Sequence, residues 1–143
     1  MKSFVFFAAS ALPVALSTCS DTGPAPTTQG PPSLEICDGE ALDAVDITSV
    51  SLDPSTSELT LVTEYSGGCA DHTFTLCWNE SWIKTLPPKA DLKLVHDANG
   101  DNCRAWITEP VTFDISLLGD ASWDAGYDEL YVLAGDAQIL WEL

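Results

Sequence analysis

Residues 67–103, GGCADHTFTLCWNESWIKTLPPKADLKLVHDANGDNC, contain the features from which the fold is inferred. They hold both histidines of the chain and three of its five cysteines. The run at 72–78 alternates, with Phe74, Leu76 and Trp78 on one face and two threonines and a cysteine on the other. Alternation with a period of two, interrupted by Gly-Gly and Pro-Pro, is typical of β-strands joined by turns. The stretch therefore predicts an all-β domain.

The same pattern of short runs and turns continues on both sides of this stretch. Eight short, mainly antiparallel strands are expected in about 100 residues, which favours a two-sheet β-sandwich over the alternative, a small β-barrel. The expected strands cover residues 45–52, 58–65, 72–78, 91–96, 103–108, 111–117, 129–134 and 137–142. Segments 79–89 and 118–128 are expected to be loops, and Gly135-Asp136 is expected to be a two-residue turn.

A hairpin is expected between the runs at 91–96 and 103–108. Asn99-Gly100 favours a type I′ turn, because both central residues of that turn have positive φ. With these two residues as the loop, His96 stands directly opposite Cys103. Opposed residues in a sheet have Cβ atoms about 4.5–5.5 Å apart. The hairpin therefore predicts that His96 and Cys103 are neighbours on one sheet face.

The N-terminus has the pattern of an export signal. Residues 1–18 carry Lys2 and then an apolar run too short to span a bilayer, which is typical of a signal peptide. The run ends in Leu16-Ser17-Thr18-Cys19, which resembles the bacterial lipobox, with Thr18 in place of the usual glycine or alanine. The resemblance implies that Cys19 carries fatty acyl chains of the palmitate kind and anchors the protein to a membrane.

The segment after Cys19 is expected to be a tether. Residues 19–33 are rich in proline, threonine and glycine, which favours a flexible linker and leaves residues 34–143 as one folded domain. Ser20 follows the lipid-bearing cysteine, and similarity to Gram-negative lipoproteins then implies the outer membrane as the location. A periplasmic or secreted protein is the alternative.

Four cysteines remain once Cys19 is set aside: Cys37, Cys69, Cys77 and Cys103. An even number in an exported domain suggests two disulfides, and four cysteines allow three pairings. We favour Cys69–Cys103, which leaves Cys37–Cys77 as the second bridge.

A zinc site is the alternative for the same residues. Cys69 and His72 are three residues apart, and they would meet His96 and Cys103 if the third strand began beside the hairpin. Two cysteines and two histidines form a structural zinc set. An oxidising compartment works against it, because thiols there form disulfides.

Calcium is a second alternative, at Asp97-x-Asn99-x-Asp101. Oxygen ligands at alternate positions suit calcium, but Asn102 stands where such loops have glycine and Thr108 where they have glutamate. We therefore favour a plain turn built from turn-forming residues. No cofactor is expected.

The charge excludes one class of partner. The chain has 22 acidic and 5 basic side chains and a net charge of −17 with histidine neutral. Such a surface repels phosphate groups, so nucleic-acid binding is not expected. The acidity is typical of a soluble extracytoplasmic surface.

Two segments resemble a group of uncharacterised bacterial lipoproteins. They are Gly67-Gly68-Cys69-Ala70-Asp71-His72-Thr73-Phe74 and His96-Asp97…Asp101-Asn102-Cys103, and the likeness covers most of residues 45–142. The resemblance implies a β-sandwich with a Cys69–Cys103 link. It implies no activity.

The sequence favours a binding or envelope-assembly role without catalysis. It lacks the Gly-x-Ser-x-Gly, P-loop and His-Glu-x-x-His patterns of common enzyme classes. A metal-binding domain or an unrecognised hydrolase is the alternative. Trp82, Trp123 and Tyr127 are the candidate contacts, because aromatic residues in loops stack on sugars or anchor protein partners. The expected partners are thus the membrane, through the lipid, and a protein or glycan at the loops.

Overall fold

A computed structural model describes residues 30–143. The predictions for the signal peptide, for Cys19 and for linker residues 20–29 lie outside the described residues. The described elements are β1 (Glu35–Ile36), β2 (Asp46–Asp53), β3 (Glu58–Gly67), β4 (Thr73–Ile83), β5 (Lys89–Asp97), β6 (Ala105–Asp114), α1 (Ser116–Asp124), β7 (Glu129–Ala134) and β8 (Ala137–Glu142).

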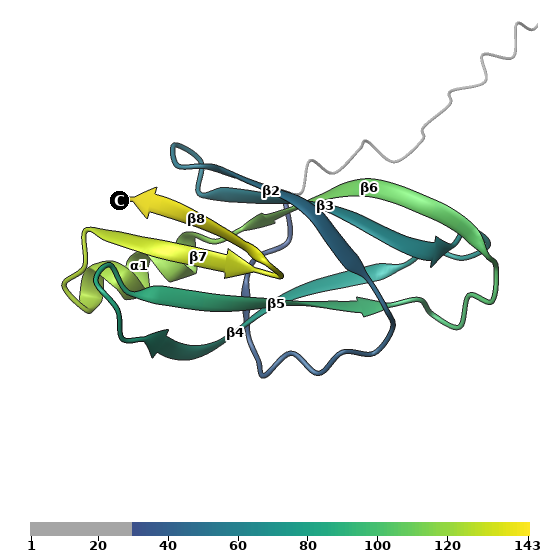
Figure 1. Cartoon of the computed structure of the whole chain (residues 1–143), viewed down its shortest axis with the longest axis horizontal. Helices are drawn as coiled ribbons and strands as arrows, with labels where there is room; N and C mark the ends of the chain where they lie inside the picture. The colour runs from purple at the N-terminus through teal and green to yellow at the C-terminus, as the bar shows by residue number, and fades with distance from the viewer. Residues whose placement is uncertain (1–29) are drawn as a thin grey trace, which may run out of the picture.

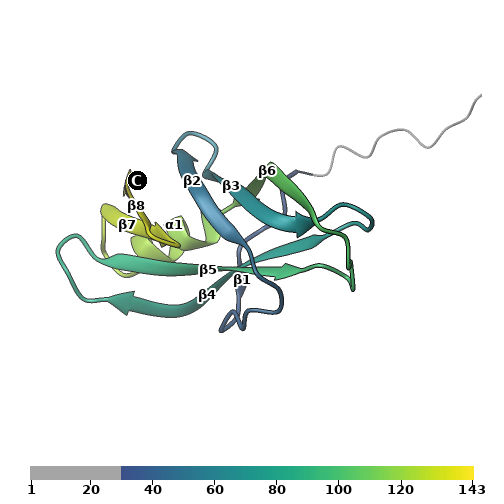
Figure 2. The ribbon, with the colours of Figure 1, turned by 45° about the vertical axis from the view of Figure 1, so that its right-hand side comes forward.

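The strands form two sheets that pack face to face (Figures 1 and 2). One sheet has five strands in the order β1-β4-β5-β7-β8, and the other has three in the order β2-β3-β6. Four of the six strand pairs are antiparallel, and β1–β4 and β5–β7 are parallel. The sheets are open, so the expected sandwich is confirmed and the barrel alternative is wrong.

The core lies between the sheets because each strand turns its apolar positions inward. In β3 every second residue from Leu59 to Gly67 is buried, as a period of two requires. These side chains face the inner positions of the other sheet and the buried face of α1. Fully buried members of the core include Leu59, Leu61, Phe113, Leu76, Leu92, Leu130, Val132 and Leu118.

The prediction of a hairpin at residues 91–108 is wrong, because β5 and β6 do not pair with each other. Asn99 and Gly100 do have positive φ, at 50° and 75°, and the Asp101 N–H donates to the Ala98 carbonyl at 2.9 Å. However, β5 pairs with β4 and β7, whereas β6 pairs with β3 in the other sheet. The turn therefore carries the chain from one sheet to the other. His96 lies opposite Phe74 instead of Cys103.

Three further expectations change. Residues 79–83 were expected to begin a loop, but they belong to β4, which continues to Ile83. The strand contains a bulge in which Glu80 has a φ of 56°. The strands expected at 103–108 and 111–117 are one strand, β6, and Pro110 is tolerated there because β6 is an edge strand. Helix α1 occupies most of the segment expected as a loop at 118–128.

The ends of the domain are also fixed by hydrogen bonds. Asp114 donates to the Pro32 carbonyl and accepts from Leu34, so the fold begins slightly before residue 34. Gly135 and Asp136 form the expected two-residue turn, with Ala134 paired to Ala137. Within residues 30–143, no helix has the length and apolar character needed to cross a membrane.

Candidate functional site

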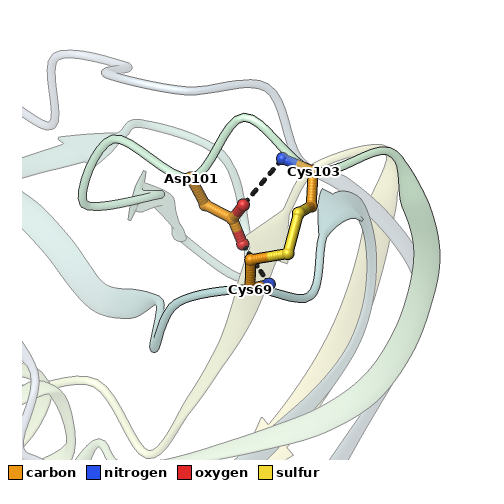
Figure 3. A group of neighbouring side chains, drawn as sticks. All are labelled: Cys69, Asp101 and Cys103. Carbon is orange, nitrogen blue, oxygen red and sulfur yellow. Dashed lines mark hydrogen bonds between the residues drawn. A yellow bond between two sulfur atoms is a disulfide. The ribbon is translucent and has the colours of Figure 1, made fainter.

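A disulfide joins Cys69 to Cys103 at one end of the sandwich (Figure 3). Cys69 lies in the β3–β4 connection and Cys103 in the β5–β6 connection, and both connections cross between the sheets. The second disulfide, Cys37–Cys77, ties the segment after β1 to the middle of β4. These are the two pairs favoured above. Each holds together parts of the chain that are distant in sequence.

The zinc alternative is wrong, because disulfide sulfurs are not thiolates and do not ligate zinc as cysteine does. Asp101 lies beside the two sulfurs, so that three groups of ligand type are close together. Its carboxylate is occupied by N–H donors, as described next. The described residues at this end therefore form a covalently closed structure and no metal cage.

Asp101, in the β5–β6 connection, joins that connection to the β3–β4 connection by hydrogen bonds. Its Oδ2 accepts the backbone N–H groups of Gly68 and Cys69 at 2.8 Å and of Ala70 at 3.0 Å, and its Oδ1 accepts that of Cys103 at 2.8 Å. Its side chain is 0% exposed. These hydrogen bonds, from Cys103 and Cys69 foremost, hold the pKa of Asp101 well below its usual range, although burial acts in the opposite direction.

The residues of the calcium alternative, Asp97, Asn99 and Asp101, form hydrogen bonds within the turn. The oxygens of Asp101 point at N–H groups, and Asp97 Oδ1 accepts the N–H of Asn99 at 2.8 Å. The Asn99 amide donates to the Asp71 carbonyl at 2.7 Å. The carboxylates are thus used within the turn, as expected for turn-forming residues.

His72 and His96 are in contact with each other next to Asp101. Nδ1 of His72 is 2.7 Å from Nε2 of His96, and Nε2 of His72 is 3.2 Å from Oδ2 of Asp101. Nδ1 of His96 is 3.0 Å from the Ala44 carbonyl oxygen. All four ring nitrogens therefore have partners among the described residues. Neither imidazole, as placed, offers a free nitrogen to a substrate.

Aromatic rings enclose the two histidines. The ring of His96 stacks on Phe74 with 4.9 Å between centroids, and Tyr65 lies 4.6 Å from His72 and 4.8 Å from His96. The Tyr65 hydroxyl donates to Glu109. Burial, assisted by this bond, raises the pKa of Tyr65 to about 12.

A hollow of about 280 Å³ opens beside His96. Its lining includes the acidic residues Asp43, Asp46 and Glu64, together with Trp106, whose side chain is 64% exposed. His96 itself is only 1% exposed, so it lies deep in this part of the domain.

The three predicted aromatic contacts gather at the opposite end of the long axis, near α1 and the end of β4 (Figure 1). Trp82 and Tyr127 meet edge to face with 5.8 Å between ring centroids. Tyr127 and Trp123 line a shallow hollow of about 230 Å³ with Gly126 and Asp128. Trp123 is 71% exposed, whereas Trp82 and Tyr127 are half-buried. Trp82 lies at the end of a strand instead of in a loop.

The sequence predicted that the two histidines and Asp101 belong to the candidate site. It did not predict the three other parts of the site, which are Tyr65, the Ala44 carbonyl and exposed Trp106. The alternation of β3 places Tyr65 on the same face as Leu61, which was a usable signal that it points inward. The Ala44 carbonyl carries no signal in the sequence, because it is a backbone group.

The fold and its bridges define a disulfide-bonded β-sandwich of an oxidising, extracytoplasmic compartment. No family model and no curated protein matches the chain. A protein of unknown function (DUF1344) from Bacteroides vulgatus is similar in structure, with 17% identity, a TM-score of 0.47, and coverage of 72% of this chain and 49% of that one.

A second solved structure, described as a toxin-related protein from Parabacteroides distasonis, is similar with 14% identity and a TM-score of 0.42. The match covers 79% of this chain and 60% of that one. The chain thus spans less than two thirds of the length of either protein.

Proposed function

We propose that this protein is a lipid-anchored, non-catalytic binding protein of the cell envelope. Its contact surface is the aromatic end, defined here as Trp82, Trp123 and Tyr127. The observation that carries the proposal is the 71% exposure of Trp123 next to a hollow that it shares with Tyr127. A large exposed indole is poorly placed for stability in water and well placed to meet a partner.

The chemistry of this surface suits the apolar face of a sugar ring or an apolar side chain of a protein. Tyr127 packs edge to face on Trp82, and Trp82 in turn packs edge to face on buried Trp78, with 5.0 Å between the ring centroids. Such support limits the number of ring orientations and so lowers the entropy lost on binding. Asp128 beside the hollow offers a hydrogen-bond acceptor for a hydroxyl or amide.

Anchoring through Cys19 completes the proposal. The disulfides support export, and the acidic surface avoids direct contact with anionic headgroups. The segment between Cys19 and Pro32 would act as a tether that holds the domain clear of the membrane, at the outer membrane in a Gram-negative cell.

The binding surface is tested by screening the purified protein against cell-envelope glycans and, separately, extracytoplasmic peptides. Trp123→Ala is expected to weaken any interaction found by at least about tenfold, as loss of a central aromatic contact does. Trp106→Ala is the matched control, because Trp106 is also exposed but lies on β6 at the other end. Equal effects of the two variants, or no ligand in either panel, would contradict the proposal.

The anchor is tested independently by growing cells with labelled palmitate. The wild-type protein is expected to take up label and to sediment with membranes, and Cys19→Ala is expected to do neither. A Cys19→Ala protein that still sediments with membranes would show that lipid at Cys19 is not the anchor.

A further inference from the structure

The histidine pair, His72 and His96, has more hydrogen-bond partners than two neutral imidazoles can satisfy. A neutral imidazole carries one N–H and one bare nitrogen. Two neutral rings therefore have two protons for the four nitrogens that face partners here. The identity of each partner shows where protons are required.

The outer nitrogens both face acceptors. Nδ1 of His96 faces the Ala44 carbonyl oxygen at 3.0 Å, so it must donate. Nε2 of His72 faces Oδ2 of Asp101 at 3.2 Å, and that oxygen already accepts backbone N–H groups. A carboxylate in this setting is ionised and cannot donate, so Nε2 of His72 must also carry a proton.

The inner nitrogens then require a third proton. Nδ1 of His72 and Nε2 of His96 are 2.7 Å apart, which is a hydrogen-bond distance. If both rings were neutral with their outer nitrogens protonated, two lone pairs would face each other at this distance. Moving a proton from Nε2 to Nδ1 of His72 would relieve that contact but set a lone pair against the Asp101 carboxylate. Each of the four neutral arrangements leaves at least one repulsive contact.

We infer that His72 and His96 share one buried proton and act as a single positive charge, which links β5 and the β3–β4 connection to each other and, through the Ala44 carbonyl, to the segment before β2. The proton lies between Nδ1 of His72 and Nε2 of His96. A fourth proton has no place, because two N–H groups would then point at each other.

The surroundings of the pair favour one positive charge. Asp101 from the β5–β6 connection neutralises it directly. Asp43, whose carboxylate accepts the Ala98 N–H at 2.8 Å, lines the hollow beside His96 together with Asp46 and Glu64. From β3 and β6, the Tyr65 ring faces both histidines, and Glu109 holds the hydroxyl of that tyrosine. The lining of this hollow includes no lysine or arginine.

The shared proton lies between residues that connect several parts of the fold. His96 belongs to β5 and holds the segment before β2 through two bonds, from Nδ1 to the Ala44 carbonyl and from the Asp43 N–H to its own carbonyl at 2.9 Å. His72 holds the β3–β4 connection to Asp101. In a neutral pair at least one of these side-chain contacts becomes repulsive, which weakens the links of the pair to the Ala44 carbonyl or to Asp101.

The test counts protons by NMR in the purified exported protein, labelled in nitrogen and free of a polyhistidine tag. The chain has only two histidines, so every imidazole signal comes from this pair. Three ring N–H groups on four nitrogens are expected near neutral pH, one of them shifted far downfield by the N–H···N bond. Two ring N–H groups in the folded protein, or four, would overturn the inference.

Discussion

Gly67 shows how closely the buried histidine pair is packed. A Cβ on Gly67 would lie 2.5 Å from both Cε1 and Nε2 of His72 and 3.1 Å from Oδ2 of Asp101. We predict that Gly67→Ala lowers the free energy of unfolding by about 1–3 kcal/mol, the usual cost of overpacking. Denaturant unfolding measures it, with Gly30→Ala as the control because no atom lies within 4 Å of a Cβ there. Equal stabilities of the two variants would show that His72 moves aside freely.

Tyr65 gives a second residue-level prediction, at alkaline pH. Its pKa is raised to about 12 by burial and by its bond to Glu109. Because the folded state disfavours the phenolate, this contribution to stability is complete below about pH 10, the ordinary tyrosine pKa, and is lost as pH rises toward 12. The difference in tyrosinate absorbance between wild type and Tyr65→Phe should show a group titrating near this value. A difference curve centred near 10 would contradict it.

Sequence patterns identified some of these residues and not others for a physical reason. Cysteines and histidines are few, and their clustering near Gly67 and Gly100 is visible in one dimension. Asp101 is one of 22 acidic residues, and only the direction of its carboxylate distinguishes it. That direction depends on N–H groups from the distant residues 68–70.

Among the elements, local chemistry was predictable and the choice of partner strand was not. Asn99 and Gly100 adopt the positive φ values that their identities favour. A type I′ turn usually closes a hairpin, yet here β6 extends away and pairs with β3 over ten residues. Pairing with β3 gives β6 a long partner and a shared core, a gain that depends on residues far from the turn. Strand alternation alone does not encode it.

Helix α1 was not predicted because its buried face has a weak apolar pattern. Leu118 and Ser122 are four residues apart and buried, and a serine at an inner position weakens the apolar signal of the helix. The Ser122 hydroxyl, 0% exposed, has no hydrogen-bond partner among the described residues. We predict that Ser122→Ala raises the free energy of unfolding by about 1 kcal/mol, because it removes an unsatisfied buried group and adds helix propensity. Exposed Ser116→Ala should change it by less than about 0.5 kcal/mol. A loss of stability in Ser122→Ala would reveal a partner for the hydroxyl, such as a buried water.

The whole domain depends on two covalent links that act differently. Cys69–Cys103 has a sequence separation of 34 and joins two connections between the sheets, whereas Cys37–Cys77 has a separation of 40 and joins the end of β1 to β4, both in the five-stranded sheet. Loop closure alone assigns each bridge a similar stabilisation of about 4 kcal/mol. The surroundings differ, because the backbone N–H groups of Cys69 and Cys103 both donate to Asp101.

We therefore predict that the paired variants Cys69→Ala/Cys103→Ala and Cys37→Ala/Cys77→Ala both lose about 2–4 kcal/mol of unfolding free energy, but that only the first changes the histidine NMR signals. Freeing the β3–β4 and β5–β6 connections loosens the donors around Asp101 and so the partner of His72. Cys77 pairs with Lys93, three positions along β4 from the pair that Phe74 forms with His96, so loss of the Cys37–Cys77 bridge should leave the histidine signals in place. An intact mass about 4 Da below that of the reduced protein confirms beforehand that both bridges are formed. Identical histidine signals in the two variants would mean that Asp101 and the histidine pair keep their arrangement without the Cys69–Cys103 bridge.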